Sequence, residues 1–568
     1  MLPAFISSCG VLRRLRANVG KLCRVCSSQQ IANSRCSLSL SCQTHKSEKD
    51  SEDFGTEEGK VEQKFRKHEY SNPFERTFGI LKDDVVSYYK KRRKFIEDIA
   101  KKAQSNAEAN AKPASKNIYG FEPSSGDVEE NIWPSHCDVL VVGGGAMGSS
   151  IAYHIKEKAR GGLNVVVVEE DPGYKKASTV LSVGGIRQQF SIPENIELSM
   201  YGMEFLRNSP ELLAVEGLDT PDIQFNPNGY LTLASEEGYE QLRQNFELQI
   251  DMGAKVSFLT KSELSKMYPW LNVSGVAAGV LGRENEGWFD PWSLLIGLQR
   301  KAISLGTQYI SGKVTGFSEE TMDDVILEGT QQSNIKRITA AEVTLPSGET
   351  RTINFAILVA ASGAWTGELG RMAGIGEGHG ILSVPIPIEP RKRYVYCVHA
   401  PDGPGLQSPL LVDPNGTYFR REGLGGLYLC GQSPPEDKEP NVDDLDVDYS
   451  FFNDNVWLTI AQRVPAFEKL KLHSSWAGYY DYNAFDQNGI IGLHPLFSNF
   501  MIASGFSGHA LTLPGGVTQP LAGIQQAPGI GRAVMECIMY GGYETINLER
   551  FGFERVLADV PLFESNIV

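Results

Sequence analysis

Apolar runs, glycine turns and helical patterns alternate along the chain from about residue 137 onward. The run DVLVV (Asp138–Val142) leads into GGGAMG, a helical pattern extends through about Lys158, and the run LNVVVVEE (Leu163–Glu170) follows. Two further apolar runs, NFAILVAASGAW (Asn354–Trp365) and NFMIASGFSGH (Asn499–His509), lie far downstream. Continuous apolar runs are typical of parallel strands that are buried on both faces. The pattern therefore predicts a βαβ unit within a buried parallel sheet.

The segments between these runs are rich in Tyr, Thr and Val and predict a second, largely antiparallel domain. A chain of 568 residues also exceeds the size of one ordinary hydrophobic core. We expect an α/β protein in which a Rossmann-like dinucleotide-binding domain is interleaved with an α+β substrate domain built on a largely antiparallel sheet. The expected parts are a leader (1–47), a charged linker with an exposed helix (48–132), the dinucleotide-binding domain with a C-terminal tail (133–220, 296–375 and 471–568) and the substrate domain (221–295 and 376–470).

Residues 1–47 differ from the rest of the chain in charge. They contain seven Lys and Arg residues and no Asp or Glu, whereas the formal net charge of the whole chain is −15, so the remainder carries about −22. The segment opens on the apolar stretch MLPAFIS and is rich in serine. This composition is typical of a mitochondrial transit peptide, and the alternative is a disordered basic tail. We therefore expect import into mitochondria.

Composition excludes several other classes of protein. The acidic remainder lacks a basic stripe interleaved with aromatic residues, so no nucleic-acid partner is expected. Five of the nine cysteines lie in the leader, where Cys23 and Cys26 form a lone CxxC, so neither a disulfide framework nor a metal site is expected. No apolar run is long enough to span a bilayer. The basic cluster Lys90–Lys94 is either a peripheral contact with the anionic inner membrane or a solvated helix face.

The turn after the first apolar run carries a dinucleotide-binding pattern. Gly143, Gly145 and Gly148 form GxGxxG between a strand and a helix, where backbone amides and the helix dipole face a pyrophosphate. Glu169 ends the next strand, at a position suited to accept from the 2′-hydroxyl of an unphosphorylated ribose. Ala146 and Met147 open the helix and are expected to contact the cofactor. Alternatively, the glycines only tighten the turn.

Glu170 is the rival acid for the ribose, but the alternation of side chains along a strand turns it to the opposite face. Glu169 is therefore the preferred ligand.

Three downstream stretches suggest which dinucleotide is bound. ASTVLSVGGIRQQFS (Ala177–Ser191), AASGAW (Ala360–Trp365) and GFSGH (Gly505–His509) resemble the D-amino-acid oxidase and sarcosine oxidase superfamily of FAD-dependent amine oxidoreductases. The resemblance extends from about Cys137 to Gly542 and implies FAD as the cofactor and a small amino-acid-like substrate. By this resemblance, the further FAD-contacting residues are Ser182, Val314, Ser362, Gly363, Trp365, Gly505, Phe506, Ser507, Gly508 and His509.

Relatives of the sarcosine oxidase type hold the substrate carboxylate with an arginine and a lysine. Arg187 matches the arginine, although it could instead pair with Glu194 or Glu197. The lysine is absent. Thr512 takes its place if no gap is assumed, and Gln525 takes it if residues 511–524 are an insertion.

We favour Gln525, because PGIGRAVMECIMYGG would then form the glycine turn and the following helix of the family. Losing the ammonium group costs about one to two powers of ten in affinity for a carboxylate. A simple amino acid is therefore a weaker candidate substrate.

The same resemblance bears on the remaining polar residues. His509 is a catalytic base or, as we favour, a hydrogen-bonding neighbour of the flavin. Arg391–Arg393 form a second cationic group that supports a strand end or faces an acidic partner, and Tyr479, Tyr480 and Tyr482 are expected in the pocket wall. The flavin is expected to be non-covalently bound, because Ala477 or Gly478 stands where some relatives carry the tethering cysteine.

A closer resemblance links the chain to a mitochondrial branch of the family that assists assembly of respiratory complex I. It is carried by GWFDPW, IEPRKRYVY, YFRREGLG, WAGYYDYNAFDQNG and QQAPGIGRAV. It implies complex I subunits or assembly intermediates as partners. Three functions stay open: an assembly factor that retains an oxidoreductase-like site, a matrix dehydrogenase of an N-methylated or secondary amino acid, and a scaffold in which the flavin only supports folding.

Overall fold

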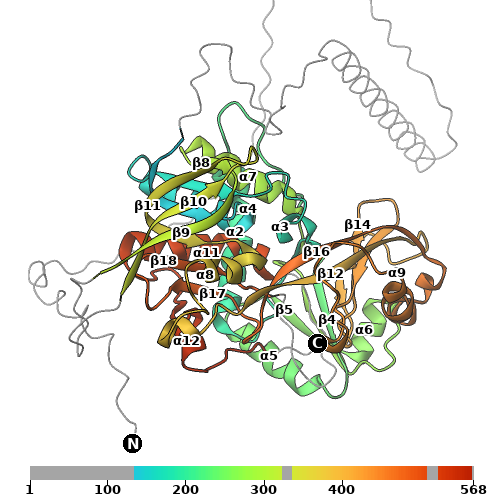
Figure 1. The fold of residues 1–568 in the computed structure, drawn as a ribbon. Coiled ribbons are helices and arrows are strands. Elements are labelled where there is room, and N and C mark those ends of the chain that lie inside the picture. Colours follow the sequence, from blue (N-terminus) through green and yellow to red (C-terminus); the bar gives the residue numbers. More distant parts are fainter. Residues whose placement is uncertain (1–132, 323–334, 508–521, 566–568) are drawn as a thin grey trace, which may run out of the picture. The chain divides into compact units, whose positions relative to one another are not determined.

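The computed structural model describes residues 133–322, 335–507 and 522–565, and Figure 1 shows its ribbon. An eight-stranded sheet, here called the first sheet, has the order β17-β18-β11-β1-β2-β8, and β10 pairs with both β11 and β9. Its strands are β1 (His136–Val142), β2 (Val165–Glu169), β8 (Gln308–Ser311), β9 (Lys313–Thr321), β10 (Lys336–Thr344), β11 (Thr350–Ala360), β17 (Ile490–Leu493) and β18 (Phe500–Ser504).

The centre of the first sheet is parallel and buried on both faces. β1 pairs in parallel with β11 on one side and with β2 on the other. Val139 and Val141 pack into one hydrophobic core, whereas Leu140 and Val142 pack into another on the opposite face. This two-sided burial explains why the sequence of β1 is continuously apolar rather than alternating. The predicted parallel sheet is confirmed.

Helices α2 (Ala146–Ala159), α4 (Pro193–Leu212), α7 (Pro291–Ser304) and α11 (Ala522–Tyr540) pack together against one face of this sheet. Glycines let them approach closely. A Cβ at Gly531 would lie 2.3 Å from the Ser150 hydroxyl oxygen of α2, and one at Gly202 would lie 2.0 Å from the Gln525 carbonyl oxygen. The expected glycine turn in PGIGRAV is therefore wrong. Gly529 and Gly531, the two glycines of this stretch, lie inside α11, where they make room for neighbouring helices.

A second eight-stranded sheet has the order β16-β12-β15-β14-β13-β4-β6-β5 and is antiparallel except for the β13–β4 pair. This second sheet confirms the largely antiparallel substrate domain. Its strands are β4 (Tyr230–Ala234), β5 (Val256–Thr260), β6 (Ala278–Gly282), β12 (Ile388–His399), β13 (Leu410–Val412), β14 (Tyr418–Glu422), β15 (Leu427–Gly431) and β16 (Lys471–Asn483). Two short strands, β3 (Gly185–Ile186) and β7 (Gly287–Trp288), pair with each other.

Shorter helices complete the described part of the chain. The α-helices are α3 (Ser178–Leu181), α5 (Tyr239–Asp251), α6 (Lys261–Met267), α8 (Thr366–Met372), α9 (Tyr449–Phe451), α10 (Leu458–Arg463) and α12 (Glu554–Leu557). The 3-10 and π segments are η2 (Gly363–Trp365), η3 (Gly380–Ser383), η4 (Glu436–Lys438), η5 (Phe452–Trp457), η6 (Pro465–Lys469) and η7 (Glu549–Phe551).

Two expected boundaries differ from the structure. The strand expected to extend to Trp365 ends at Ala360, and a 3-10 turn follows. β16 falls after the expected domain boundary at residue 470, yet it belongs to the second sheet, because it pairs with β12 along nearly its whole length. In Figure 1, β12 and β16 run side by side. The chain returns to the first sheet only at β17.

Other expectations concern the leader and linker, residues 1–132, which lie outside the described residues. Within the described ranges, no helix combines the length and the apolar character that crossing a bilayer requires. The cysteines of those ranges, Cys137, Cys397, Cys430 and Cys537, are all unbridged.

Candidate dinucleotide site

The glycine turn after β1 is built by close approach of main-chain segments. Gly143 has a φ of +101°, and a Cβ there would lie 2.4 Å from the Ala361 carbonyl oxygen at the end of β11. A Cβ at Gly148 would lie 1.8 Å from the Gly143 carbonyl oxygen. These two glycines are therefore required by the fold itself, whichever ligand the turn binds.

Gly145 is different, because the fold does not require a glycine there. Its φ is −63°, and the nearest atom to an added Cβ is the Thr179 hydroxyl oxygen at 3.3 Å. A small shift of one side chain would accommodate alanine. Gly145 nevertheless faces the large cavity described below. A glycine that the fold does not need, at a cavity wall, indicates that a ligand approaches the backbone at this position.

Helix α2 begins at this turn and presents its N-terminus to the cavity. The first amides of a helix have no acceptor within the helix. The Ala146 amide donates to the Thr179 hydroxyl at 3.1 Å, and intrahelical bonding starts when the Ser149 amide donates to the Gly145 carbonyl. The first turn contains no acidic residue. The amide of Met147 and the positive end of the helix dipole are thus available to an anion such as a pyrophosphate.

Glu169 closes β2 beside the turn and lines the cavity. Its two carboxylate oxygens accept from the Gly144 amide at 2.7 Å and from the Asp171 amide at 2.9 Å. Burial raises the pKa of this carboxyl, and the two amides partly offset the effect. Each oxygen keeps a lone pair for a ribose hydroxyl. Glu170 lies exposed at the rim and pairs with Lys313 at 3.6 Å, so Glu169 is the fixed acid.

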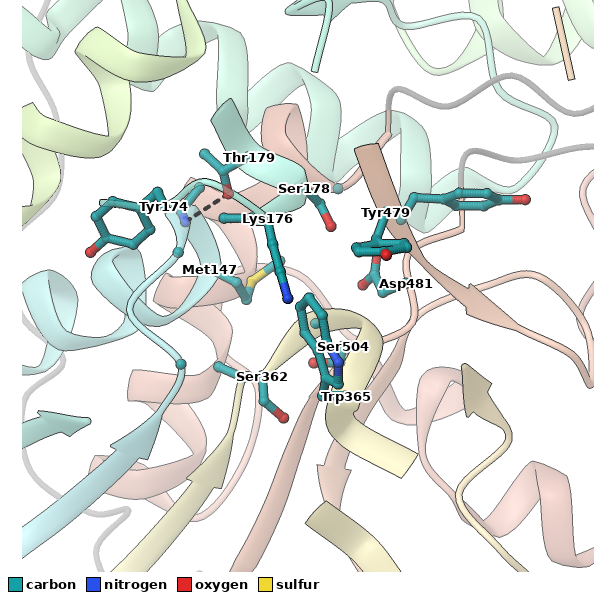
Figure 2. A pocket seen from close by; sticks show the side chains of 18 of the residues that line it. Met147, Tyr174, Lys176, Ser178, Thr179, Ser362, Trp365, Tyr479, Asp481 and Ser504 are labelled. Carbon is teal, nitrogen blue, oxygen red and sulfur yellow. Dashed lines mark hydrogen bonds between the residues drawn. The ribbon is translucent and has the colours of Figure 1, made fainter. Parts of the chain in front are cut away.

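The cavity has a volume of about 640 Å³ and is lined by both sheets. The first sheet and its connections contribute the glycine turn, Glu169 and Trp365. The second sheet contributes Tyr418 and the β16 stretch from Gly478 to Asp481. Figure 2 shows Trp365 close to Tyr479, and their rings meet edge to face with centroids 5.9 Å apart. A volume of this size suits a cofactor-sized ligand.

Most of the predicted cofactor residues line this cavity. They are Gly143, Gly145, Ala146, Met147, Glu169, Ser182, Val314, Ser362, Gly363, Trp365 and Phe506. Gly148 and Gly505 lie just behind the wall, the first beneath Gly143 and the second with its amide donating to Asp481. Gly508 and His509, like Thr512, lie outside the described residues.

Arg187 and Gln525 come together, but neither is among the described residues that line the cavity. The Gln525 side-chain oxygen accepts from the Arg187 backbone amide at 2.7 Å. The Arg187 guanidinium lies over the rings of Phe190 and Tyr230, with centroids at 4.9 and 5.6 Å. Gln525 is held there because α11 packs its first turns against α4. The two residues are thus bonded to each other and lie outside the described lining of the cavity.

Glu194, one of the two alternative partners of Arg187, pairs instead with Arg550 at 3.0 Å. The charge of Arg187 acts on the buried carboxyls of Glu286 and Glu564. The pKa of Glu286 rises to about 7 because burial outweighs the backbone amide of Gln188, the Gln189 side chain and the Arg187 charge. Glu286 directly precedes the motif GWFDPW, so this part of the chain contributes a buried carboxyl that accepts from Gln188 and Gln189.

The cationic run on β12 is used inside the chain. Arg393 lines the cavity, but its guanidinium donates to both carboxylate oxygens of Glu439 at 2.7 and 2.8 Å. Lys392 pairs with Asp444 at 3.0 Å, and Arg391 pairs with Glu389 at 2.8 Å. An acidic segment of this chain therefore neutralises these cations.

The wall residues that sequence reasoning missed include Thr179, Lys176, Tyr418 and Asp481. Thr179 lies in ASTVLSVGGIRQQFS, one of the stretches that resemble the family, so its place in the wall could have been predicted. Asp481 lies in the stretch WAGYYDYN, but its role depends on the pairing of β16 with β12, which local sequence patterns do not reveal. Of the expected tyrosines, Tyr479 and Tyr480 line the cavity.

The strand order, the glycine turn and the fixed acid together define a dinucleotide-binding protein built on two sheets. Residues 138–534 match the model of the FAD-dependent oxidoreductase family known as DAO, and the chain belongs to this family. Its cofactor is FAD.

Similar proteins agree with this assignment. The chain is 49% identical to "FAD-dependent oxidoreductase domain-containing protein 1" of Xenopus laevis over 77% of this chain and 85% of the relative. It is 26% identical to the mitochondrial sarcosine dehydrogenase of Mus musculus over 68% of this chain and 39% of that protein. The fold resembles L-proline dehydrogenase from P. horikoshii with a TM-score of 0.60 and 24% identity, covering 76% of this chain and 100% of that one.

The residues present fit FAD. The free helix amides and Gly145 suit the pyrophosphate, and Glu169 suits the adenosine ribose. Ala477 and Gly478, the candidates for a tether position, carry no group that could bond covalently to the flavin. Gly478 lines the cavity, and a Cβ there would meet the Leu181 side chain at 2.8 Å.

The substitution Gly145→Ala should abolish FAD binding while leaving the fold intact. The added methyl group should occupy space that the pyrophosphate needs. In the protein without FAD its nearest neighbour is the Thr179 hydroxyl oxygen at 3.3 Å, which a small side-chain shift relieves. We expect affinity for FAD to fall by roughly a hundredfold or more. Flavin absorbance after reconstitution and gel filtration measures the loss.

Gly161→Ala is the matched control, because a Cβ there meets nothing within 4 Å. It should bind FAD as the wild type does. Normal flavin content in Gly145→Ala would contradict the assignment of this turn as the pyrophosphate site.

Proposed function

We propose that the protein is a mitochondrial FAD-dependent oxidoreductase that oxidises a C–N bond of a small amine, of which N-methylated and secondary amino acids are one class. One observation carries the proposal: a single cavity joins the dinucleotide cradle to an aromatic-walled chamber formed by the second sheet. A dinucleotide anchored at Gly145 and Glu169 leaves that chamber for the flavin ring and a substrate. The similarity to mitochondrial sarcosine dehydrogenase supports the choice of substrate chemistry.

The chain's own residues exclude water and orient the substrate. When bound, FAD supplies a two-electron acceptor for the hydride from the substrate carbon. Trp365 and Tyr479 contact each other in the cavity wall, and Tyr418 also lines the cavity. The hydroxyl of Tyr418 is buried and has no hydrogen-bond partner among the described residues. Positioning of this kind accounts for much of the rate of a reaction that needs no dedicated acid or metal.

Arg187 and Gln525 have a supporting part in this proposal. Their bond links the segment after β3 to the start of α11, close to where Ile524 and Phe506 line the chamber. They hold the wall in place.

Anaerobic mixing with candidate substrates tests the oxidoreductase function. We expect at least one of sarcosine, dimethylglycine, proline and D-amino acids to bleach the flavin band at about 450 nm, and Gly145→Ala protein to show no such band. Stopped-flow absorbance measures the rate. A flavin that stays oxidised with all of these compounds and with simple secondary amines would favour the scaffold role instead.

We also propose that the protein serves the assembly of respiratory complex I on the matrix side of the inner membrane, with complex I subunits or assembly intermediates as partners. The charge pattern of residues 1–47 supports the location. The five stretches that resemble the assembly-linked branch of the family support the role. One of them, IEPRKRYVY, forms β12 at the cavity wall.

Complementation separates the need for the cofactor from the need for the polypeptide. In cells that lack the protein, wild type and Gly161→Ala should restore complex I, whereas Gly145→Ala should restore less, because it lacks FAD. Native gels and complex I activity measure the outcome. Full rescue by Gly145→Ala at matched protein levels would contradict a flavin-dependent assembly role.

A further inference from the structure

Asp481 places a carboxylate in the wall of the chamber that the flavin ring and substrate would share. It lies on β16, two residues after Tyr479, and Figure 2 shows both side chains at the same side of the cavity. Its Oδ2 atom accepts from the Gly505 amide at 2.7 Å and from the Phe506 amide at 3.0 Å. One oxygen is thereby fixed by the main chain, which sets the direction of the other.

The second oxygen, Oδ1, has no hydrogen-bond donor among the described residues, and Asp481 forms no ion pair there. Burial raises the pKa of this carboxyl, and the backbone amides of Phe506, Gly505 and Asp481 itself only partly offset the effect. A carboxylate removed from water costs free energy unless it gains a cation or a full set of donors. The hydrogen bonds from the Gly505 and Phe506 amides both reach Oδ2.

The described wall has four cations, and two of them are held in ion pairs. Arg393 is bound by Glu439, and Lys313 pairs with Glu170. Lys176 extends toward Trp365 (Figure 2), and its ammonium group forms no ion pair with a described residue. Lys175 follows Tyr174 on the same segment, and its amide donates to Asp171.

The sequence limits what the two internal gaps and the last three residues could add. Residues 323–334, 508–521 and 566–568 contain no lysine or arginine, and His509 is their one basic residue. The described wall therefore has an acid, and neither Thr512 nor Gln525, the two candidates for the position, is the lysine that holds a substrate carboxylate in the related amine oxidases.

We propose that Asp481 binds the protonated nitrogen of the substrate through Oδ1, so that this site selects cationic amines and does not require a carboxylate on the substrate. The inference rests on the proposed oxidoreductase function and specifies its substrate class: small secondary or tertiary amines, with or without an acidic group. Tyr418 and Tyr479 add aromatic surface, which favours alkylammonium groups.

Binding of unreactive ions to the FAD-loaded full-length protein tests this directly. Tetramethylammonium, tert-butanol of similar size, and acetate are titrated while the flavin spectrum and the heat of binding are followed. We expect the wild type to bind tetramethylammonium about tenfold or more tightly than tert-butanol. Equal binding of the cation and the neutral alcohol would overturn the proposal, and this comparison needs no variant.

Asp481→Asn then assigns the effect to one residue. The amide oxygen can still accept from Gly505 and Phe506, so flavin content should stay close to that of the wild type. Tetramethylammonium should bind about tenfold more weakly or worse, and acetate should bind no more weakly than before. Asp437→Asn, at an exposed acid outside the cavity wall, is the charge-matched control. It should change neither the binding of tetramethylammonium nor that of acetate.

The outcomes separate this inference from the proposed function. If no amine reduces the flavin but cation binding still depends on Asp481, the oxidoreductase function fails and the cation site stands. If amines reduce the flavin while Asp481→Asn leaves cation binding unchanged, the cation site fails. Altered flavin affinity with unchanged cation binding would show that Asp481 instead faces the cofactor, and would also overturn the proposal.

Discussion

The approach of three main-chain segments at the end of β1 is the constraint on which the rest of the structure depends. Gly143 packs against the backbone that follows β11, and Gly148 packs beneath Gly143. This brings the N-terminus of α2 to the carboxyl edge of the parallel sheet, between β2 and β11. Glu169, the last residue of β2, lies at the same edge. Any side chain at either glycine would separate the helix from the sheet. The cradle for the cofactor therefore follows from how the fold closes.

The second sheet adds a wall to this cradle and makes it a larger cavity. β16 is the edge strand of the antiparallel sheet, and it brings Gly478–Asp481 to the cavity opened by the first sheet. Ion pairs between β12 and the acidic residues Glu439 and Asp444 lie behind it. The wall is thus stiffened by charges that neutralise one another, which leaves Asp481 as an acid without an ion-pair partner among the described residues of the chamber.

The sequence predicted those features that depend on residues close together in the chain. The glycine turn, α2 and Glu169 lie within one βαβ unit, so spacing and apolar periodicity were sufficient to place them. Asp481 and Arg393 could not be placed, because they meet the cavity only through strand pairing that local patterns do not encode. Gln525 was expected just before a glycine turn formed by PGIG. It lies in a helix instead, since Gly529 and Gly531 serve helix packing, a use that sequence spacing alone does not distinguish from a turn.

A crystal structure of the protein with FAD bound tests the central claim most directly. We expect a phosphate oxygen within hydrogen-bond distance of the Met147 amide, a ribose hydroxyl on Glu169, and the flavin ring in the chamber beside Tyr479 and Asp481. FAD bound elsewhere, or a glycine turn that keeps the pyrophosphate away from the backbone of Gly145, would contradict it.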